Sequence, residues 1–204
     1  MDISKAAFDL IVAEEVSSQK AYERLYRHTE WPGAASGVTV GIGYDVGYAT
    51  PARLKADWAG QIPDSMIMAL TTACGVTGAA ARPLAAKLKS QVDIPWAAAL
   101  HVFEHVDIPR WTATVRKHLP NTELLSADSL GALVSLAYNR GPSFDKPGDR
   151  YREMRAIKSH MGAKAFEKIP AEFRAMRRLW PALKGLRDRR EREARLFEHE
   201  PAAS

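Results

Sequence analysis

The spacing of apolar side chains predicts a first helix between residues 4 and 15. The apolar positions of this stretch are Ala7, Phe8, Ile11 and Val12, and the polar positions include Lys5, Asp9 and Glu14. One face can therefore pack inward while the other faces water. Glu15 falls at the carboxyl end of the helix, where the helix dipole disfavours an ionised carboxylate. The same field favours the protonated carboxyl group that a general acid needs.

A second pattern, at residues 37–45, reads Gly-Val-Thr-Val-Gly-Ile-Gly-Tyr-Asp. Apolar residues alternate there with small ones, and glycines interrupt the run, which predicts a short twisted strand with tight turns and hence a small sheet. Such glycines let the backbone approach a ligand closely, and Thr39 and Asp45 project polar groups from the same ribbon. Nucleotide binding is disfavoured, because no βαβ unit surrounds these glycines.

The rest of the chain is predicted to be helical. Thr50 can cap a helix that begins at Pro51 and ends at Gly60. Further helices are expected at 63–73, 79–89, 95–105, 109–118, 127–140, 150–160 and 171–180, and in an Arg/Glu-rich segment near the carboxyl terminus. The predicted fold class is therefore α+β and predominantly α-helical. No internal repeat or long linker divides the chain.

Length and composition agree with one domain. The chain has 204 residues, of which 46% are hydrophobic, and this suffices for a buried core. No stretch approaches the roughly 18 uninterrupted apolar residues of a membrane helix. The amino terminus lacks a basic start followed by an apolar run, so we expect synthesis in the cytoplasm without a signal peptide. A single cysteine, Cys74, excludes an intrachain disulfide.

The formal charge of +5 is modest, but Arg and Lys are concentrated in residues 168–195. A basic region of this kind attracts anionic polymers. It could also attract nucleic acid. We find no recognition helix, zinc finger or basic strip with stacking aromatics, so nucleic acid is not an expected partner.

The segment His101-Val102-Phe103-Glu104-His105 matches the inverted zinc-protease motif His-x-x-Glu-His. On a helix the two histidines would share a face and could hold zinc, with Glu104 as the base for the metal-bound water. A catalytic zinc also needs a third protein ligand and second-shell partners, and no later pattern in the sequence indicates one. A zinc protease is therefore the weaker interpretation, and ordinary surface or half-buried histidines are the stronger one.

Three segments together resemble the amino-terminal lobe of bacteriophage-type lysozymes, including the endolysins. They are Glu14-Glu15, Lys20-Ala21-Tyr22 and the run 37–43. Phage lysozymes usually carry a His where this chain has Tyr44, and an Asp several residues before the threonine, which is missing between Glu15 and Thr39. Asp45, six residues after Thr39, is similar instead to the second carboxylate of the pesticin-like muramidases, which are the closer match.

The carboxyl-terminal half carries two further resemblances. The apolar run 130–141, which closes on Asn139 and a glycine, is similar to the segment of this superfamily that lines the saccharide groove. Asn139 would offer amide hydrogen bonds to sugar groups. The segment 185–197 resembles the final endolysin helix with its Gly-Leu-x-x-Arg-Arg-x-x-Glu pattern, and the resemblance implies that Arg189 pairs with the catalytic glutamate and orients it.

The resemblance implies a bilobed phage-lysozyme-like fold within one domain. The amino-terminal lobe, with the small sheet, would span about 1–60, the helical lobe about 61–199, and 200–204 would form a loose tail. The implied activity is that of a muramidase, a glycoside hydrolase that cleaves the β-1,4 bond between N-acetylmuramic acid and N-acetylglucosamine in peptidoglycan. It would act in the periplasm or on the cell wall, as an endolysin or an antibacterial effector. We expect a monomer, and for an effector a cognate immunity protein.

In this interpretation Glu15 is the general acid, Asp45 activates water or stabilises the transition state, and Thr39 holds the water. Asn139, Tyr44 and Tyr22 would contact substrate. No metal or organic cofactor is expected, because two carboxyl groups in different environments can divide the acid and base roles.

Alternatives remain at three points. Glu14 replaces Glu15 if the first helix is rotated, and Glu23 or Glu30 can supply the second carboxylate in place of Asp45. A lysozyme fold can also persist as a non-catalytic module that binds peptidoglycan or protein, because fold alone does not secure activity.

Overall fold

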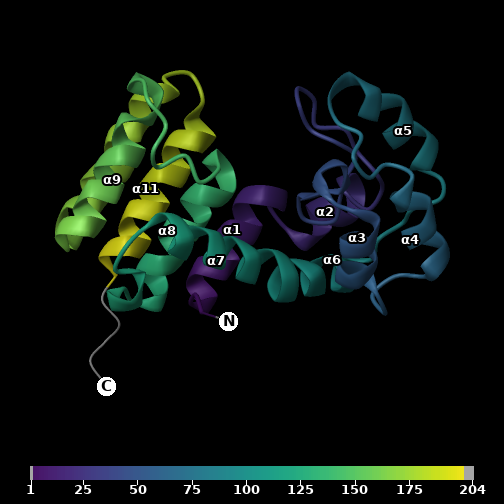
Figure 1. Cartoon of the computed structure of the whole chain (residues 1–204), viewed down its shortest axis with the longest axis horizontal. Coiled ribbons are helices and arrows are strands. Elements are labelled where there is room, and N and C mark those ends of the chain that lie inside the picture. Colours follow the sequence, from purple (N-terminus) through teal and green to yellow (C-terminus); the bar gives the residue numbers. More distant parts are fainter. Residues whose placement is uncertain (1, 200–204) are drawn as a thin grey trace. The chain divides into compact units, whose positions relative to one another are not determined.

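The computed structural model describes residues 2–199, which are mostly helical and contain one two-stranded antiparallel sheet. The predicted class, predominantly α-helical with a small sheet, is therefore confirmed. The elements, labelled in Figure 1, are α1 (Lys5–Val16), α2 (Gln19–Leu25), β1 (Thr39–Val40), β2 (Tyr44–Asp45), α3 (Pro51–Trp58), α4 (Asp64–Thr71), α5 (Ala81–Leu88), α6 (Trp96–Val102), α7 (Ile108–His118), α8 (Ala127–Arg140), α9 (Arg152–Ala163), α10 (Ile169–Ala175) and α11 (Lys184–Glu198).

Local sequence explains where several of these helices begin. Thr50 caps α3, since its hydroxyl oxygen accepts the backbone N–H of Arg53 at 3.2 Å, and Pro51 occupies the first turn, where no N–H is needed. Ser126 caps α8 in the same way by accepting the N–H of Ser129 at 3.0 Å. The predicted helices 95–105 and 109–118 are joined by a π-helical turn, Phe103–Asp107, which the sequence pattern does not reveal.

The chain forms two compact units. One consists of residues up to Glu14 together with those from Ile108 onward, and the other is the continuous stretch Glu15–Asp107. The lobe boundary expected near residue 60 is therefore corrected, because both sides of that position belong to the second unit. The tail expected at 200–204 lies outside the described residues.

In the unit Glu15–Asp107, a β-hairpin is surrounded by short helices. Thr39 pairs with Asp45 and Val40 with Tyr44, and an isolated antiparallel bridge adds Glu30 beside Thr39. The core beneath the hairpin includes the fully buried Trp58 and Tyr22. Tyr44 of the hairpin packs edge-on against Trp58, so the strand is supported by this core.

The other unit is a bundle centred on α8. Helix α8 packs against α7 and α11, and α10 packs against α9 and α11 (Figure 1). Every residue from Ser129 to Ala137 is buried, so the middle of this helix is enclosed on all sides, as its largely apolar sequence indicates. Gly131 permits the close approach of α1, because a Cβ atom there would lie 2.1 Å from the Cβ of Ala7. None of the helices within residues 2–199 is long and apolar enough to span a membrane.

Candidate active site

A pocket of about 260 Å³ in the unit Glu15–Asp107 brings together two carboxylic acids and a threonine. Glu15 comes from the last turn of α1, Glu30 from the segment before the hairpin, and Thr39 from β1. All three side chains are half-buried. We call this the Glu15 pocket, and its lining consists of Glu15, Val16, Tyr26, His28, Glu30, Pro32, Thr39, Val40, Gly41 and Gly43.

Backbone pairing places Glu30 next to Thr39. The N–H of Glu30 donates to the carbonyl oxygen of Thr39 at 3.0 Å, and the N–H of Thr39 donates to the carbonyl oxygen of Glu30 at 2.8 Å. Residues that oppose each other in this way carry their side chains on the same face of the ribbon, with Cβ atoms about 4.5–5.5 Å apart. The carboxyl group of Glu30 and the hydroxyl group of Thr39 therefore stand side by side at the pocket.

The turn between the two strands forms one wall of the pocket with backbone rather than side chains. Gly41 and Gly43 both have positive φ, +61° and +78°, which other residues adopt only with strain. A Cβ atom on Gly41 would also lie 3.0 Å from the ring of Trp58. The missing side chain at Gly41 therefore makes room for Trp58, and the turn keeps a conformation that suits glycine.

Burial raises the pKa of Glu30 above its ordinary value of 4.5, and the positive charge of Lys89 offsets this effect only in part. A carboxylate with a raised pKa is a stronger base when it is ionised, and its protonated form persists to higher pH. The pocket thus holds one carboxyl group whose protonation is tuned by its surroundings and a second one, Glu15, at a helix end.

The carboxylate of Asp45, which is the expected second catalytic carboxylate, accepts hydrogen bonds from backbone N–H groups. Its two carboxylate oxygens accept the N–H of Gly37 at 3.1 and 3.0 Å, and Oδ1 also accepts the N–H of Gly47 at 2.9 Å. It does not line the Glu15 pocket. These bonds hold the hairpin to the preceding loop, and the expected role of Asp45 in activating water stays a prediction. Glu30, the alternative for this role, does line the pocket.

Tyr22 and Tyr44 lie in the core and do not line the pocket, which corrects their expected contact with substrate. Tyr22 is fully buried, and its hydroxyl donates to the carbonyl oxygen of Ile94 at 3.0 Å. Tyr44 is 4% exposed, donates to Asp57 at 2.7 Å and packs edge-on against Trp58. Burial raises the pKa of both phenols. Tyr44 connects the hairpin to the core, and Tyr22 connects α2 to it.

The other two candidate carboxylates lie elsewhere. Glu14 belongs to the other unit, where it forms an ion pair of 2.6 Å with Arg192. Burial raises the pKa of Glu14, and the charge of Arg192 opposes that rise. Glu23 is exposed on α2 and accepts a hydrogen bond from Gln19 at 2.7 Å. Neither residue lines the Glu15 pocket.

Arg189 and Asn139 also belong to the unit that contains α8 and α11. Arg189 is buried and donates to Glu193 at 3.2 Å and to the backbone and hydroxyl oxygens of Ser135. Its pairing with the catalytic glutamate stays a prediction. Asn139 is exposed at the end of α8 and lines a separate pocket with Arg140 and Trp180. Its contact with substrate likewise stays a prediction.

The zinc-protease motif does not assemble a metal site. The rings of His101 and His105 stack with centroids 4.3 Å apart, and Nδ1 of His105 lies 3.0 Å from the carbonyl oxygen of His101. Among residues 2–199, no three His, Cys, Asp or Glu side chains are arranged to hold a metal ion. The pair therefore lacks the third ligand that a catalytic zinc needs.

Two polar side chains of the pocket, Tyr26 and His28, were not predicted from the sequence. Nδ1 of His28 lies 2.9 Å from the carbonyl oxygen of Val92, which anchors one edge of the ring. His28, Glu30 and Pro32 alternate along the chain, and all three line the pocket. That period of two is the signal of an extended segment that could have identified them.

No protein-family model matches the chain, and no curated protein is similar enough to it to be counted as a relative.

Proposed function

We propose that this chain is a peptidoglycan hydrolase, a muramidase that cleaves the β-1,4 bond between N-acetylmuramic acid and N-acetylglucosamine on a bilobed phage-lysozyme-like fold. The observation that carries the proposal is the presence of Glu15, Glu30 and Thr39 in the lining of one pocket. Hydrolysis of a glycosidic bond typically uses two carboxyl groups on either side of that bond, one protonated and one ionised.

In the proposed mechanism Glu15 is the general acid. It protonates the glycosidic oxygen as the bond to the anomeric carbon breaks, so that the leaving sugar departs as a neutral alcohol. Its place in the last turn of α1 and in the lining of the pocket supports this role.

Glu30 is the second carboxylate of the proposed mechanism. It accepts a proton from the attacking water as the water oxygen bonds to the anomeric carbon. Thr39, the backbone partner of Glu30, holds that water through its hydroxyl group. Burial raises the pKa of Glu30, which makes its ionised form a stronger base and supports this assignment.

The decisive experiment is digestion of purified peptidoglycan by the wild-type, Glu15→Gln and Glu30→Gln proteins, with mass spectrometry of the released muropeptides. We expect products with reducing N-acetylmuramic acid ends from the wild type. Each variant should lose at least about a hundredfold in rate, because each removes an acid or base group. Glu23→Gln, which changes an exposed glutamate outside the pocket, is the matched control and should retain full activity.

Binding of peptidoglycan by the wild type without any released product would refute hydrolysis and support a binding module instead. Release of products by Glu30→Gln at the wild-type rate would refute only the assignment of Glu30 as the second carboxylate.

Hydrolysis is expected to invert the anomeric carbon, because the proposed water attacks directly and no covalent intermediate forms. Proton NMR of the first products in a short digestion would show the α-anomer from the β-linked substrate. A β-anomer as the first product would indicate that the second carboxylate acts as a nucleophile.

The proposed place of action is the periplasm or the cell wall, as an endolysin or as an antibacterial effector. An effector would be accompanied by an immunity protein that fills the Glu15 pocket. Expression of the chain with an added periplasmic signal should lyse the host, and Glu15→Gln should abolish lysis. Harmless periplasmic expression of folded wild-type protein would contradict this role.

A further inference from the structure

A second pocket, in the unit that contains α8 and α11, is lined by arginines and aromatic rings. Its volume is about 260 Å³, and we call it the Arg140 pocket. Helix α8 supplies two of its residues, the 3-10 turn Asp149–Tyr151 supplies two more, and the others lie around the start of α11. The lining consists of Asn139, Arg140, Arg150, Tyr151, Trp180 and Leu186.

Arg140 is held rigidly, yet part of its guanidinium group has no partner. Its Cζ atom lies 5.1 Å from the ring centroid of Trp180 and 5.8 Å from that of Tyr151, both within cation-π range. Nη2 donates to the carbonyl oxygen of Arg150 at 2.7 Å. Nε and Nη1 are buried and donate no hydrogen bond to any described residue. Such unpaired buried donors cost free energy, and they leave the charge of Arg140 only partly compensated by its surroundings.

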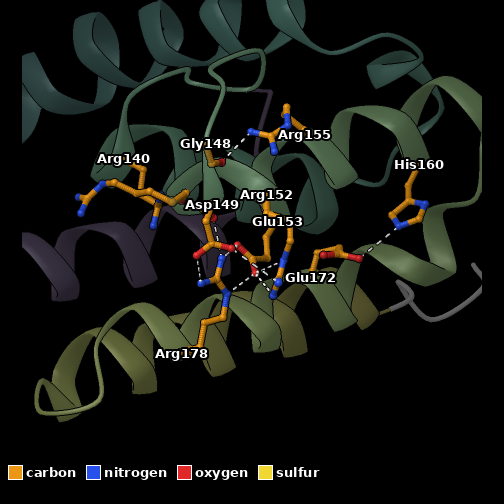
Figure 2. A network of polar contacts seen from close by, with 10 residues as sticks. Arg140, Gly148, Asp149, Arg152, Glu153, Arg155, His160, Glu172 and Arg178 are labelled. Atoms are coloured by element: carbon orange, nitrogen blue, oxygen red, sulfur yellow. Dashed lines mark hydrogen bonds and ion pairs between the residues drawn. The ribbon is translucent and has the colours of Figure 1, made fainter.

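The acids closest to this pocket are already neutralised by other arginines. Arg178 lies between Asp149 and Glu153, as Figure 2 shows, and donates to Glu153 at 2.7 Å and to Asp149 at 2.5 Å. Arg152 adds a further bond of 2.9 Å to Glu153. Figure 2 also shows Arg140 apart from these carboxylates.

Within residues 2–199, neither Arg140 nor Arg150 forms an ion pair, so the pocket keeps an excess of positive charge. Burial and the charge of Arg150 lower the pKa of Arg140, as expected for a guanidinium group without a counter-ion.

We propose that the Arg140 pocket binds an oxyanion, a carboxylate or phosphate group, carried by a small ligand such as a saccharide. Guanidinium groups bind both anions through charge-assisted hydrogen bonds. The exposed guanidinium of Arg150 and the amide of Asn139 supply accessible donors, and the rings of Tyr151 and Trp180 offer apolar surface beside them. The volume suits a ligand at the small end of the usual range. The inference does not depend on the proposed hydrolysis, because binding is measured without turnover.

The test is an NMR titration of the full chain with three probes. N-acetylmuramic acid carries a carboxylate, N-acetylglucosamine is its neutral counterpart, and inorganic phosphate supplies the other anion. We expect saturable shifts of the Trp180 indole and Arg140 Nε resonances with at least one anion and none with N-acetylglucosamine. The anion that acts at the lower concentration identifies the source of the oxyanion. Absence of shifts with both anions would overturn the proposal.

Variants distinguish this site from general attraction to a basic protein. Arg150→Gln changes an exposed side chain, so the fold should persist, and anion affinity should fall about tenfold through loss of a charged hydrogen bond. Arg140→Lys keeps the charge but removes the planar donors, and should also weaken binding. Arg24→Gln, an exposed arginine on α2, is the matched control and should bind as the wild type does. Equal weakening by Arg24→Gln and Arg150→Gln would indicate non-specific electrostatics and refute the site.

Discussion

Two carboxylates, Glu30 and Asp45, lie opposite Thr39 in the same ribbon, one on each side of it. Asp45 directs its oxygens to the N–H groups of Gly37 and Gly47, whereas Glu30 remains at the Glu15 pocket with a raised pKa. Of the two carboxylates that are paired beside Thr39, Asp45 therefore has a structural role and Glu30 is available for catalysis.

Glu30→Gln should raise the melting temperature at pH 7 while it abolishes hydrolysis. The folded-state pKa of Glu30 lies above the unfolded value of 4.5, so ionising this group at neutral pH destabilises the folded state. A neutral amide avoids that cost. The gain should disappear at about pH 3.5, where Glu30 is protonated in both states. Thermal unfolding at the two pH values tests this, with Glu23→Gln as the control, and an equal gain at both values would contradict it.

The acid limb of the pH-rate profile should report the same group. If Glu30 must be ionised to accept a proton, activity should fall to half at a pH above 4.5 as the pH decreases. Initial rates on peptidoglycan, measured over a pH series where the protein stays folded, give this midpoint. A midpoint at or below 4.5 would exclude Glu30 as the base.

Asp45→Asn should lower stability but leave turnover by the folded protein within a few-fold of wild type. The amide retains one acceptor oxygen but places an NH₂ group near the N–H of Gly37, so we expect a loss of about 1–3 kcal/mol. Urea unfolding measures the loss, and kcat/KM well below the melting temperature measures turnover. Abolished turnover in a fully folded variant would restore Asp45 to the catalytic role.

Among the elements, the hairpin and the loop before it depend on two glycines, Gly37 and Gly47, whose backbones lie in close contact. A Cβ atom on Gly37 would lie 2.5 Å from Oδ1 of Asp45 and 2.5 Å from Cα of Gly47. Neither neighbour can move without breaking the bonds that Asp45 accepts. The strand-like sequence of residues 37–45 thus encodes a close backbone contact as well as a turn.

Gly37→Ala should therefore destabilise the protein by about 2 kcal/mol or more, as overpacking does in a rigid environment. Chemical unfolding gives the value, and Gly33→Ala provides a comparison, because a Cβ there meets no atom within 4 Å. Gly33 has a φ of +102°, so the stability lost in Gly33→Ala reports backbone strain alone. A smaller effect at Gly37 than at Gly33 would contradict the contact.

The elements were largely predictable from sequence, whereas their contacts were not. Glu15 lies in the last turn of α1 and Thr39 lies in a short strand as expected, because helical and alternating periodicities are local properties of the chain. Whether Tyr22 and Tyr44 face a ligand or the core depends on Ile94 and Asp57, which come later in the sequence. The same holds for Asp45, whose partners are fixed by the path of the loop at 31–37.

At the scale of the whole molecule, the formal charge of +5 and the sequence pI of about 9.4 should govern encounter with an anionic cell wall. Raising the salt concentration should weaken sedimentation of the protein with purified peptidoglycan, because charges further apart than about 8–10 Å are screened near physiological ionic strength. Glu15→Gln can be used for this measurement to prevent digestion. Salt-independent sedimentation would show that local contacts dominate.

The discontinuity of the unit that contains α8 has a consequence for synthesis on the ribosome. Ala7 of α1 packs against Gly131 of α8, and the N–H of Ser4 donates a hydrogen bond to the carbonyl oxygen of Ala127. During synthesis α1 therefore stays without these partners until α8 has emerged, while the stretch Glu15–Asp107 can collapse around its own hairpin as soon as it is complete. Helix α1 would thus be made before this stretch but would reach its native place after it.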